Sequence, residues 1–212
     1  MSVAKKLAKH LLKIKAIKLQ PNKPFTWASG LKSPIYCDNR MSLSHAKIRK
    51  FIKKELASLA LSVGDFDGVA GVATAGIAHG ALVADQLGLP FIYVRSKPKG
   101  HGRQNLIEGD ISQAKSYIVV EDLISTGGSS LLAVDALREN GATVAGVIAL
   151  FSYGFDKAKN AFQEADCPFA TLSHYGTLLT EAVDLGFINS SEKELLENWN
   201  QSPEEWSKQV KI

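Results

Sequence analysis

YIVVEDLISTGGSS, residues 117–130, is the stretch of sequence that decides the fold. It starts as an uninterrupted apolar run, ends that run at two acids, Glu121 and Asp122, and enters a loop of serine, threonine and glycine. Strands that are apolar throughout, without alternation, are typical of a parallel sheet covered on both faces. Further apolar runs occupy 66–73, 90–94 and 143–151, and helical stretches of about 75–87 and 129–140 separate the strands. The sequence therefore predicts an α/β fold with a doubly wound parallel sheet.

The 212 residues are long enough to form one domain with a sizeable core, and we expect a single domain. Residues 1–40 hold an amphipathic helix followed by a turn-rich segment, and residues 41–175 hold the α/β core. The first helix of that core is predicted at roughly 45–62, with Ser44 as its cap. Short helices are expected over 176–212.

Composition excludes several classes of protein. The chain is 45% hydrophobic and 22% charged, which is too apolar and too balanced in charge for intrinsic disorder. Its two cysteines form neither a disulfide framework nor a zinc set, so we expect a reducing, cytoplasmic location. No stretch approaches the roughly 20 apolar residues that cross a bilayer, and we expect no membrane partner.

The net charge of +4 is small because basic and acidic segments of the chain largely cancel. Residues 1–54 contain 14 Lys or Arg and a single acid, whereas residues 161–212 contain three basic and nine acidic residues. Such a basic head can indicate nucleic acid, a membrane surface or two faces of one molecule that meet. The N-terminal lysines are interpreted as the solvated face of a helix, and no nucleic-acid partner is expected.

The loop after the two acids has the composition of a phosphate cradle. Gly127 and Gly128 allow close approach of backbone N–H groups, and a helix N-terminus near Ser129 adds partial positive charge. Glu121 and Asp122 repel a phosphate, so we expect them to accept hydrogen bonds from sugar hydroxyls or to hold Mg²⁺. No lysine follows the glycines as in a Walker A loop, and the dinucleotide pattern G-x-G-x-x-G is absent. The whole array indicates a ribose 5-phosphate site, whereas either acid alone would be read as an ordinary strand-end residue.

The segment VVEDLISTGGSS resembles the phosphoribosyl-pyrophosphate signature of type I phosphoribosyltransferases. Over nearly its full length the chain resembles the bacterial orotate phosphoribosyltransferase branch of that family. The resemblance implies the family's α/β fold with a small N- and C-terminal hood, and Mg²⁺-dependent transfer of ribose 5-phosphate from 5-phosphoribosyl 1-pyrophosphate to orotate. It implies Mg²⁺ held mainly through the substrate, with no firm protein ligand. It also implies that phosphoribosyl pyrophosphate binds to Glu121, Asp122, Leu123, Ile124, Ser125, Thr126, Gly127, Gly128 and Ser129.

A basic segment, YVRSKPKGHGRQNLIEG at 93–109, follows the predicted strand 90–94. Its prolines and glycines argue against a helix or buried strand, so we predict a mobile loop that closes on a polyanion. A solvated charge run is the alternative. The resemblance implies that Arg95, Lys99 and His101 are the catalytic residues and meet the pyrophosphate. It further implies a homodimer in which the lid, residues 95–109, reaches into the partner's site.

Two more segments lie where the family places substrate. The segment GVATAGIAHG, 71–80, is rich in small residues. They suit a backbone contact to pyrophosphate and close packing of a helix on a strand equally well. The resemblance implies that Thr74 contacts pyrophosphate. FTWASGLKSPIYCDN, within 24–40, resembles the family's base-covering hood. The resemblance also implies that Ser125 touches orotate.

Two alternative functions remain open from the residues. Another type I phosphoribosyltransferase, specific for a purine or xanthine, would carry the same phosphate loop, although the hood segment favours orotate. A regulator that binds phosphoribosyl pyrophosphate without chemistry could dispense with the basic lid, whereas Arg95, Lys99 and His101 are all present here.

Overall fold

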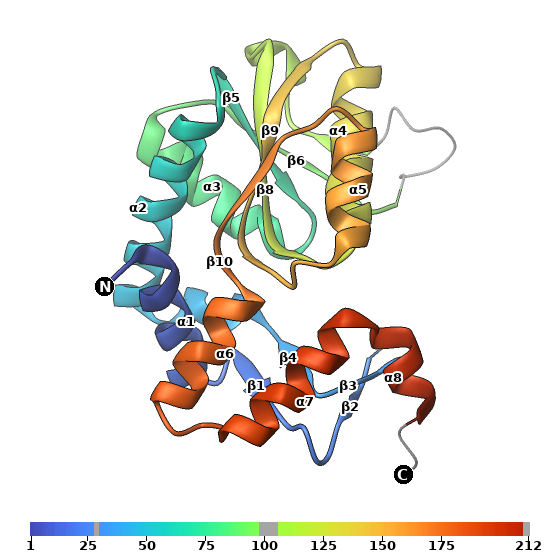
Figure 1. The fold of residues 1–212 in the computed structure, drawn as a ribbon. Coiled ribbons are helices and arrows are strands. Elements are labelled where there is room, and N and C mark those ends of the chain that lie inside the picture. Colours follow the sequence, from blue (N-terminus) through green and yellow to red (C-terminus); the bar gives the residue numbers. More distant parts are fainter. Residues whose placement is uncertain (28–29, 98–105, 210–212) are drawn as a thin grey trace. The chain divides into compact units, whose positions relative to one another are not determined.

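The structure is a computed structural model that describes residues 1–27, 30–97 and 106–209. It divides into two compact units. The terminal unit joins both ends of the chain, Met1–Ser44 and Ser173–Ile212, and the sheet unit is His45–Leu172. The predicted α/β core, 41–175, differs from the sheet unit by a few residues at either end. Figure 1 shows the elements of both units.

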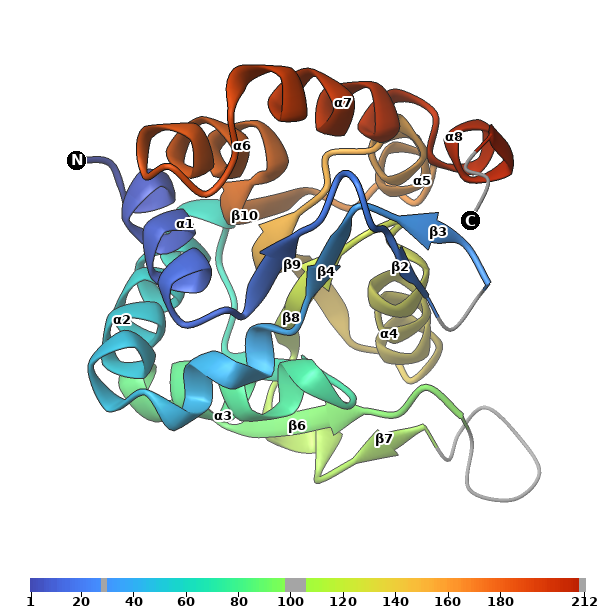
Figure 2. The same cartoon turned by 90° about the horizontal axis from the view of Figure 1, so that it is seen from below.

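The sheet unit is built on six strands in the order β10-β9-β8-β5-β6-β7. β5 runs parallel to both β6 and β8, and β8 runs parallel to β9, which confirms the predicted parallel sheet. β7 pairs antiparallel with β6 and forms a hairpin at the sheet edge (Figure 2). The strands span Gly68–Val72 (β5), Phe91–Val94 (β6), Ile107–Glu108 (β7), Ser116–Ile124 (β8), Thr143–Ser152 (β9) and Phe169–His174 (β10).

Helices cover both faces of this sheet, as a doubly wound fold requires. α2 (Ala46–Val63) and α3 (Ala75–Leu87) lie on one face, and α4 (Gly128–Glu139) and α5 (Asp156–Glu164) lie on the other (Figure 1). All five residues of β5 are buried, because a central strand is covered on both sides. A short 3-10 turn, η3 (Ile111–Gln113), precedes β8.

The terminal unit is held together by contacts between the two ends of the chain. α1 (Val3–Lys13) packs on α6 (Tyr175–Asp184), and Lys5 Nζ lies 3.6 Å from a carboxylate oxygen of Glu181. The buried ring of Trp199, on α7 (Ser190–Gln201), meets Trp27 with ring centroids 5.9 Å apart. The other elements are β1 (Ile17–Leu19), β2 (Phe25–Thr26), β3 (Lys32–Ser33), β4 (Ile35–Cys37), η1 (Asn39–Ser44) and α8 (Pro203–Gln209).

Three local predictions need correction. Ser44 does not cap α2, because it closes the 3-10 helix η1 and His45 takes the cap position. β8 does not end at the two acids but continues to Ile124. The segment 24–40 is not a loop throughout, since it contains the short strands β2, β3 and β4. Within the described ranges, no helix is both long and apolar enough to cross a membrane.

Candidate active site

The candidate site lies where three neighbouring parallel strands end. β8, β5 and β6 are adjacent in the sheet, so their carboxyl ends share one edge. The turn at Thr74 follows β5, Arg95 follows β6, and the loop from Ser125 follows β8. The Ala73 N–H donates a hydrogen bond of 2.8 Å to the Val94 carbonyl, which ties the first two turns together. In such folds ligands bind in the crevice at this edge.

Glu121 is buried inside the end of β8, with 5% of its surface exposed. One carboxylate oxygen accepts the Asp122 N–H at 2.9 Å, and the other accepts the Ser129 hydroxyl at 3.0 Å. Burial, reinforced by the neighbouring Asp122 carboxylate, raises the pKa of Glu121 from 4.5 to about 8. Glu121 is therefore mainly protonated at neutral pH and connects β8 to the first turn of α4.

Asp122 is half-buried and differs from Glu121 in its surroundings. The two side chains nevertheless interact, because, in addition to burial, the charge of Asp122 and a hydrogen bond with its side chain both raise the pKa of Glu121. The two carboxyl groups therefore form an interacting pair. Asp122 is the more exposed of the two.

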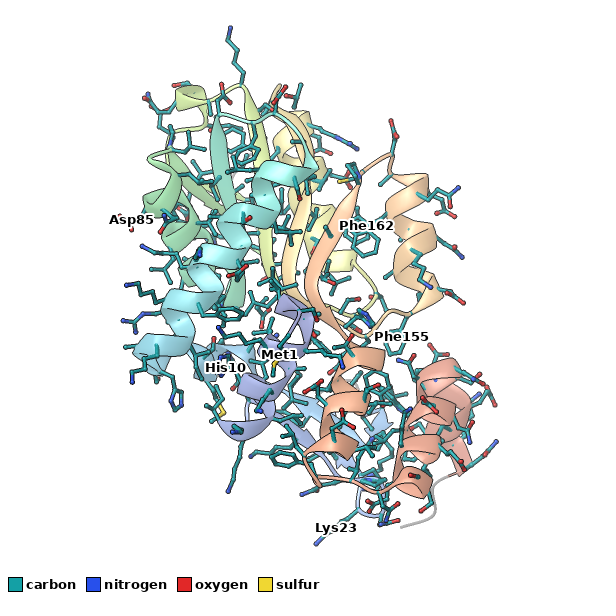
Figure 3. All side chains as sticks on the ribbon, turned by 60° about the vertical axis from the view of Figure 1, so that its left-hand side comes forward. Met1, His10, Lys23, Asp85, Phe155 and Phe162 are labelled. Atoms are coloured by element: carbon teal, nitrogen blue, oxygen red, sulfur yellow. The ribbon has the colours of Figure 1, made fainter. Side chains whose placement is uncertain are left out.

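The loop after β8 turns sharply into α4. Gly127 has φ +85°, a left-handed conformation that favours glycine, and a Cβ there would lie 2.9 Å from the Phe162 ring. Phe162 projects from α5 toward the strands (Figure 3). A Cβ on Gly128 would meet nothing within 4 Å, and Thr126, Gly128 and Ser129 are exposed. The first N–H groups of α4 lack intrahelical acceptors, so the loop presents backbone donors and hydroxyls to an anion.

Arg95 is paired with an acid that sequence reasoning did not assign to the site. Its guanidinium lies 3.2 Å from a Glu108 carboxylate oxygen, and each side chain is about one-third exposed. The Arg95 N–H also donates to the Leu106 carbonyl at 2.8 Å. The end of the basic segment is therefore not a loop, because Ile107 and Glu108 form β7. Glu108 could have been found as the first acid in a run of cations.

Lys99 and His101 lie outside the described residues, so their predicted positions stay predictions. Thr74 is exposed at the cap of α3, and the peptide bond between Ala73 and Thr74 is cis. Close packing accounts for part of the segment 71–80, since a Cβ on Gly76 would collide with the Val120 carbonyl oxygen of β8. α3 can approach the sheet this closely only with glycine there.

The described residues contain no group of three or more His, Cys, Asp or Glu placed to hold a metal ion. Mg²⁺ commonly keeps several waters and uses one or two carboxylates together with substrate phosphates. A carboxylate such as Asp122, half-buried beside the anion-binding loop, fits that mode of binding. The donor set therefore suits a magnesium ion that arrives with a phosphorylated substrate.

Comparisons with known proteins agree on one family. A family model described as a phosphoribosyl transferase domain matches residues 42–173. The orotate phosphoribosyltransferase of Porphyromonas gingivalis is 52% identical over 206 residues, which cover 97% of this chain and 98% of that protein. The crystal structure of orotate phosphoribosyltransferase from Aeropyrum pernix superposes with a TM-score of 0.73 at 30% identity, covering 86% of this chain and 99% of that one. The structure of Leishmania donovani UMP synthase gives a TM-score of 0.78 at 25% identity, covering 93% of this chain and 42% of that one.

Proposed function

Because this chain belongs to the phosphoribosyltransferase family, we propose that the carboxyl edge of its sheet binds 5-phosphoribosyl 1-pyrophosphate. The chain transfers ribose 5-phosphate from that donor to orotate, giving orotidine 5′-phosphate and pyrophosphate in pyrimidine biosynthesis. The single observation that carries the proposed site is the array of β8, two carboxylates and the loop into α4. The buried acid at the end of β8 suits the sugar hydroxyls, and the exposed hydrogen-bond donors of the loop suit the 5-phosphate.

The 5′-phosphate binds at the start of α4. Ser125, Thr126 and Ser129 supply hydroxyls, and Gly127 and Gly128 supply backbone N–H groups beside the helix N-terminus. These hydrogen-bond donors are neutral. The phosphate is therefore held by several hydrogen bonds and by the partial positive charge of the helix N-terminus. The backbone of Leu123 and Ile124 fixes the strand from which the loop departs.

The ribose lies against the end of β8, where Glu121 and Asp122 contact its hydroxyls. A protonated Glu121 can donate as well as accept a hydrogen bond, whereas an ionised Asp122 only accepts. The ring nitrogen of orotate forms a bond to the anomeric carbon while the bond to the pyrophosphate oxygen breaks, and positive charge grows on the ribose. The Asp122 carboxylate stabilises that charge.

The leaving pyrophosphate lies between the turn at Thr74 and the basic lid. Arg95, Lys99 and His101 neutralise the departing anion, and Arg95 must exchange its ion pair with Glu108 for the pyrophosphate. Mg²⁺, when bound with the substrate, supplies further neutralisation of the pyrophosphate charge. Asp122 is the described residue best placed to hold it.

Ser125 lies at the junction of β8 and the loop, from which it contacts orotate as well as phosphate. The segment 24–40 supplies the base-covering hood. Its β2–β3 hairpin is tied to α8, since the Lys32 N–H donates to the Ser207 hydroxyl at 2.8 Å. The C-terminal helices therefore act together with the hood.

The enzyme is cytoplasmic and acts as a homodimer in which the lid, 95–109, completes the partner's site. The test mixes two variants, Lys99→Ala and Asp122→Asn, each nearly inactive alone. A shared site predicts that the mixture recovers up to about one quarter of wild-type activity, because a mixed dimer holds one site with both native residues. No recovery, while subunit exchange is demonstrated with tagged chains, would exclude a lid shared across the dimer.

The reaction itself is followed by the loss of orotate absorbance. Turnover that requires orotate, phosphoribosyl pyrophosphate and Mg²⁺ together is the expected result. The same assay with hypoxanthine, guanine and xanthine separates this activity from the purine-specific branch. Binding of phosphoribosyl pyrophosphate with no turnover of any base would instead identify a regulator.

A further inference from the structure

A groove on the sheet unit lies apart from the candidate active site. It is formed by the first half of α2 and the last half of α3, and its volume is about 780 Å³. Small-molecule sites occupy roughly 300–1,000 Å³, so the groove is large enough for a ligand. Every charged residue that lines it is basic: Lys47, Arg49, Lys50, Lys53 and Lys54.

Three of these cations form a row. Lys47, Lys50 and Lys54 are all exposed, and their spacing of three and four residues places them on one face of α2. Within the described part of the chain, none of the three makes an ion pair. Lys53 differs, because its ammonium lies 3.2 Å from a carboxylate oxygen of Asp85 on α3. Figure 3 shows Asp85 at the outer side of that helix.

This arrangement is unfavourable for the helix without a counter-charge. Like charges three and four residues apart repel each other along a helix face. The first turn of α2 contains no acid, although the partial positive charge of a helix N-terminus favours acids there. A multiply charged anion along the row would relieve both effects.

The remaining lining residues add an apolar wall. Phe51 and Leu82 are half-buried in the groove, and Gln86 offers an amide beside them. Aromatic and aliphatic surface next to a row of cations suits a ligand with a charged chain at one end and a flat ring at the other. A single monophosphate would engage only part of the row.

We propose that the α2–α3 groove is a second anion site, which binds a linear polyphosphate, either inorganic or carried by a nucleoside. The row of Lys47, Lys50 and Lys54 holds the phosphate chain, and Phe51 with Leu82 receives a base where there is one. The site is separate from catalysis, because none of these residues belongs to the three turns at the sheet edge.

The test is calorimetric titration of the full-length enzyme with sodium tripolyphosphate at low salt. The polyphosphate can also enter the pyrophosphate position, so wild type is expected to bind two equivalents per chain. Lys50→Ala/Lys54→Ala should lose one of them, or weaken it by about tenfold or more, while its kcat and KM stay unchanged. The matched control, Lys115→Ala/Lys157→Ala, removes two exposed lysines elsewhere on the sheet unit and should keep both equivalents.

Titration with ATP and UTP distinguishes the source of the phosphate chain. If a nucleotide binds about tenfold tighter than tripolyphosphate and Leu82→Ala abolishes that gain, the ligand is a nucleoside polyphosphate. If the nucleotides and tripolyphosphate bind equally, the ligand is inorganic polyphosphate. Equal binding by the groove variant and its lysine control would overturn the proposal. So would displacement of tripolyphosphate by a lower concentration of single-stranded oligouridylate, since the groove would then be a nucleic-acid surface.

Discussion

Replacing Glu121 by glutamine should stabilise the protein, and the gain should depend on pH. The raised pKa of about 8 means that the folded state keeps the Glu121 proton where the unfolded chain, with a pKa of 4.5, has lost it. Below pH 4.5 both states are protonated and the carboxyl group has no effect on stability. Between pH 4.5 and 8 only the unfolded state ionises, so the free energy of unfolding of the wild type falls as pH rises.

The size of the effect follows from the two pKa values. Each pH unit between them costs about 1.4 kcal/mol, which gives about 3 kcal/mol at pH 7 and about 4 kcal/mol at pH 8. Glutamine is neutral throughout this range and nearly the same shape. Its carbonyl can accept the Asp122 N–H and its amide can donate to the Ser129 hydroxyl, so the local contacts survive.

The measurement is urea unfolding followed by far-UV circular dichroism at pH 5, 6, 7 and 8. The difference between Glu121→Gln and wild type should be about 1 kcal/mol at pH 5 and grow with each unit. Glu181→Gln is the matched control, because Glu181 is equally buried but lies near Lys5. It should lose stability or leave it unchanged.

A constant difference between pH 5 and pH 8 would refute the reasoning, and so would a loss of stability on Glu121→Gln at pH 8. Either result would mean that Glu121 is ionised in the folded protein. Other titrating groups, including the buried His79, are common to both proteins and cancel in the difference.

Three further outcomes are expected. Gly127→Ala should lower the free energy of unfolding by about 2 kcal/mol or more, because the backbone of Gly127 is left-handed and the new Cβ would meet the Phe162 ring. Gly128→Ala should not lower it, and thermal unfolding of both variants measures the difference. Burial lowers the pKa of His79 to about 4, so the contribution of His79 to stability should fall by about 3 kcal/mol as pH drops from 6.5 to 4. Acid titrations measure this fall as the change, over that range, in the stability difference between wild type and His79→Leu. Ser129→Ala should raise the KM for phosphoribosyl pyrophosphate by about tenfold, measured in steady-state kinetics, and an unchanged KM would exclude its hydroxyl from the phosphate site.

The sheet could be predicted because its signals are local. Apolar runs bounded by helices define β5, β6, β8 and β9, and the predicted helix 75–87 has the same bounds as α3. The terminal unit could not be predicted in this way. Strands of two or three residues are too short to show an alternation of apolar and polar residues. The association of residues 1–44 with 173–212 depends on contacts far apart in sequence, such as that of Trp27 with Trp199.

The candidate site was predictable in its parts but not in its pairings. The loop 125–129 has the composition of an anion site, and the structure places it at a helix start beside the turns after β5 and β6. The ion pair between Arg95 and Glu108 depends on the β6–β7 hairpin, whose strand β7 has only two residues. No periodicity in a segment that short predicts a strand.

The two acids at the end of β8 show most clearly what sequence alone could not separate. In the sequence the two acids are adjacent, and adjacent acids suggest a shared role in binding substrate. The structure gives them unequal burial: Glu121 is buried and accepts the Ser129 hydroxyl at the start of α4, whereas Asp122 is half-buried and its side chain interacts with Glu121. The loop beside Glu121 carries no cationic side chain that would hold it ionised, so burial decides its protonation. The same neutral donors that suit a phosphate therefore leave the pKa of the buried Glu121 carboxyl group raised.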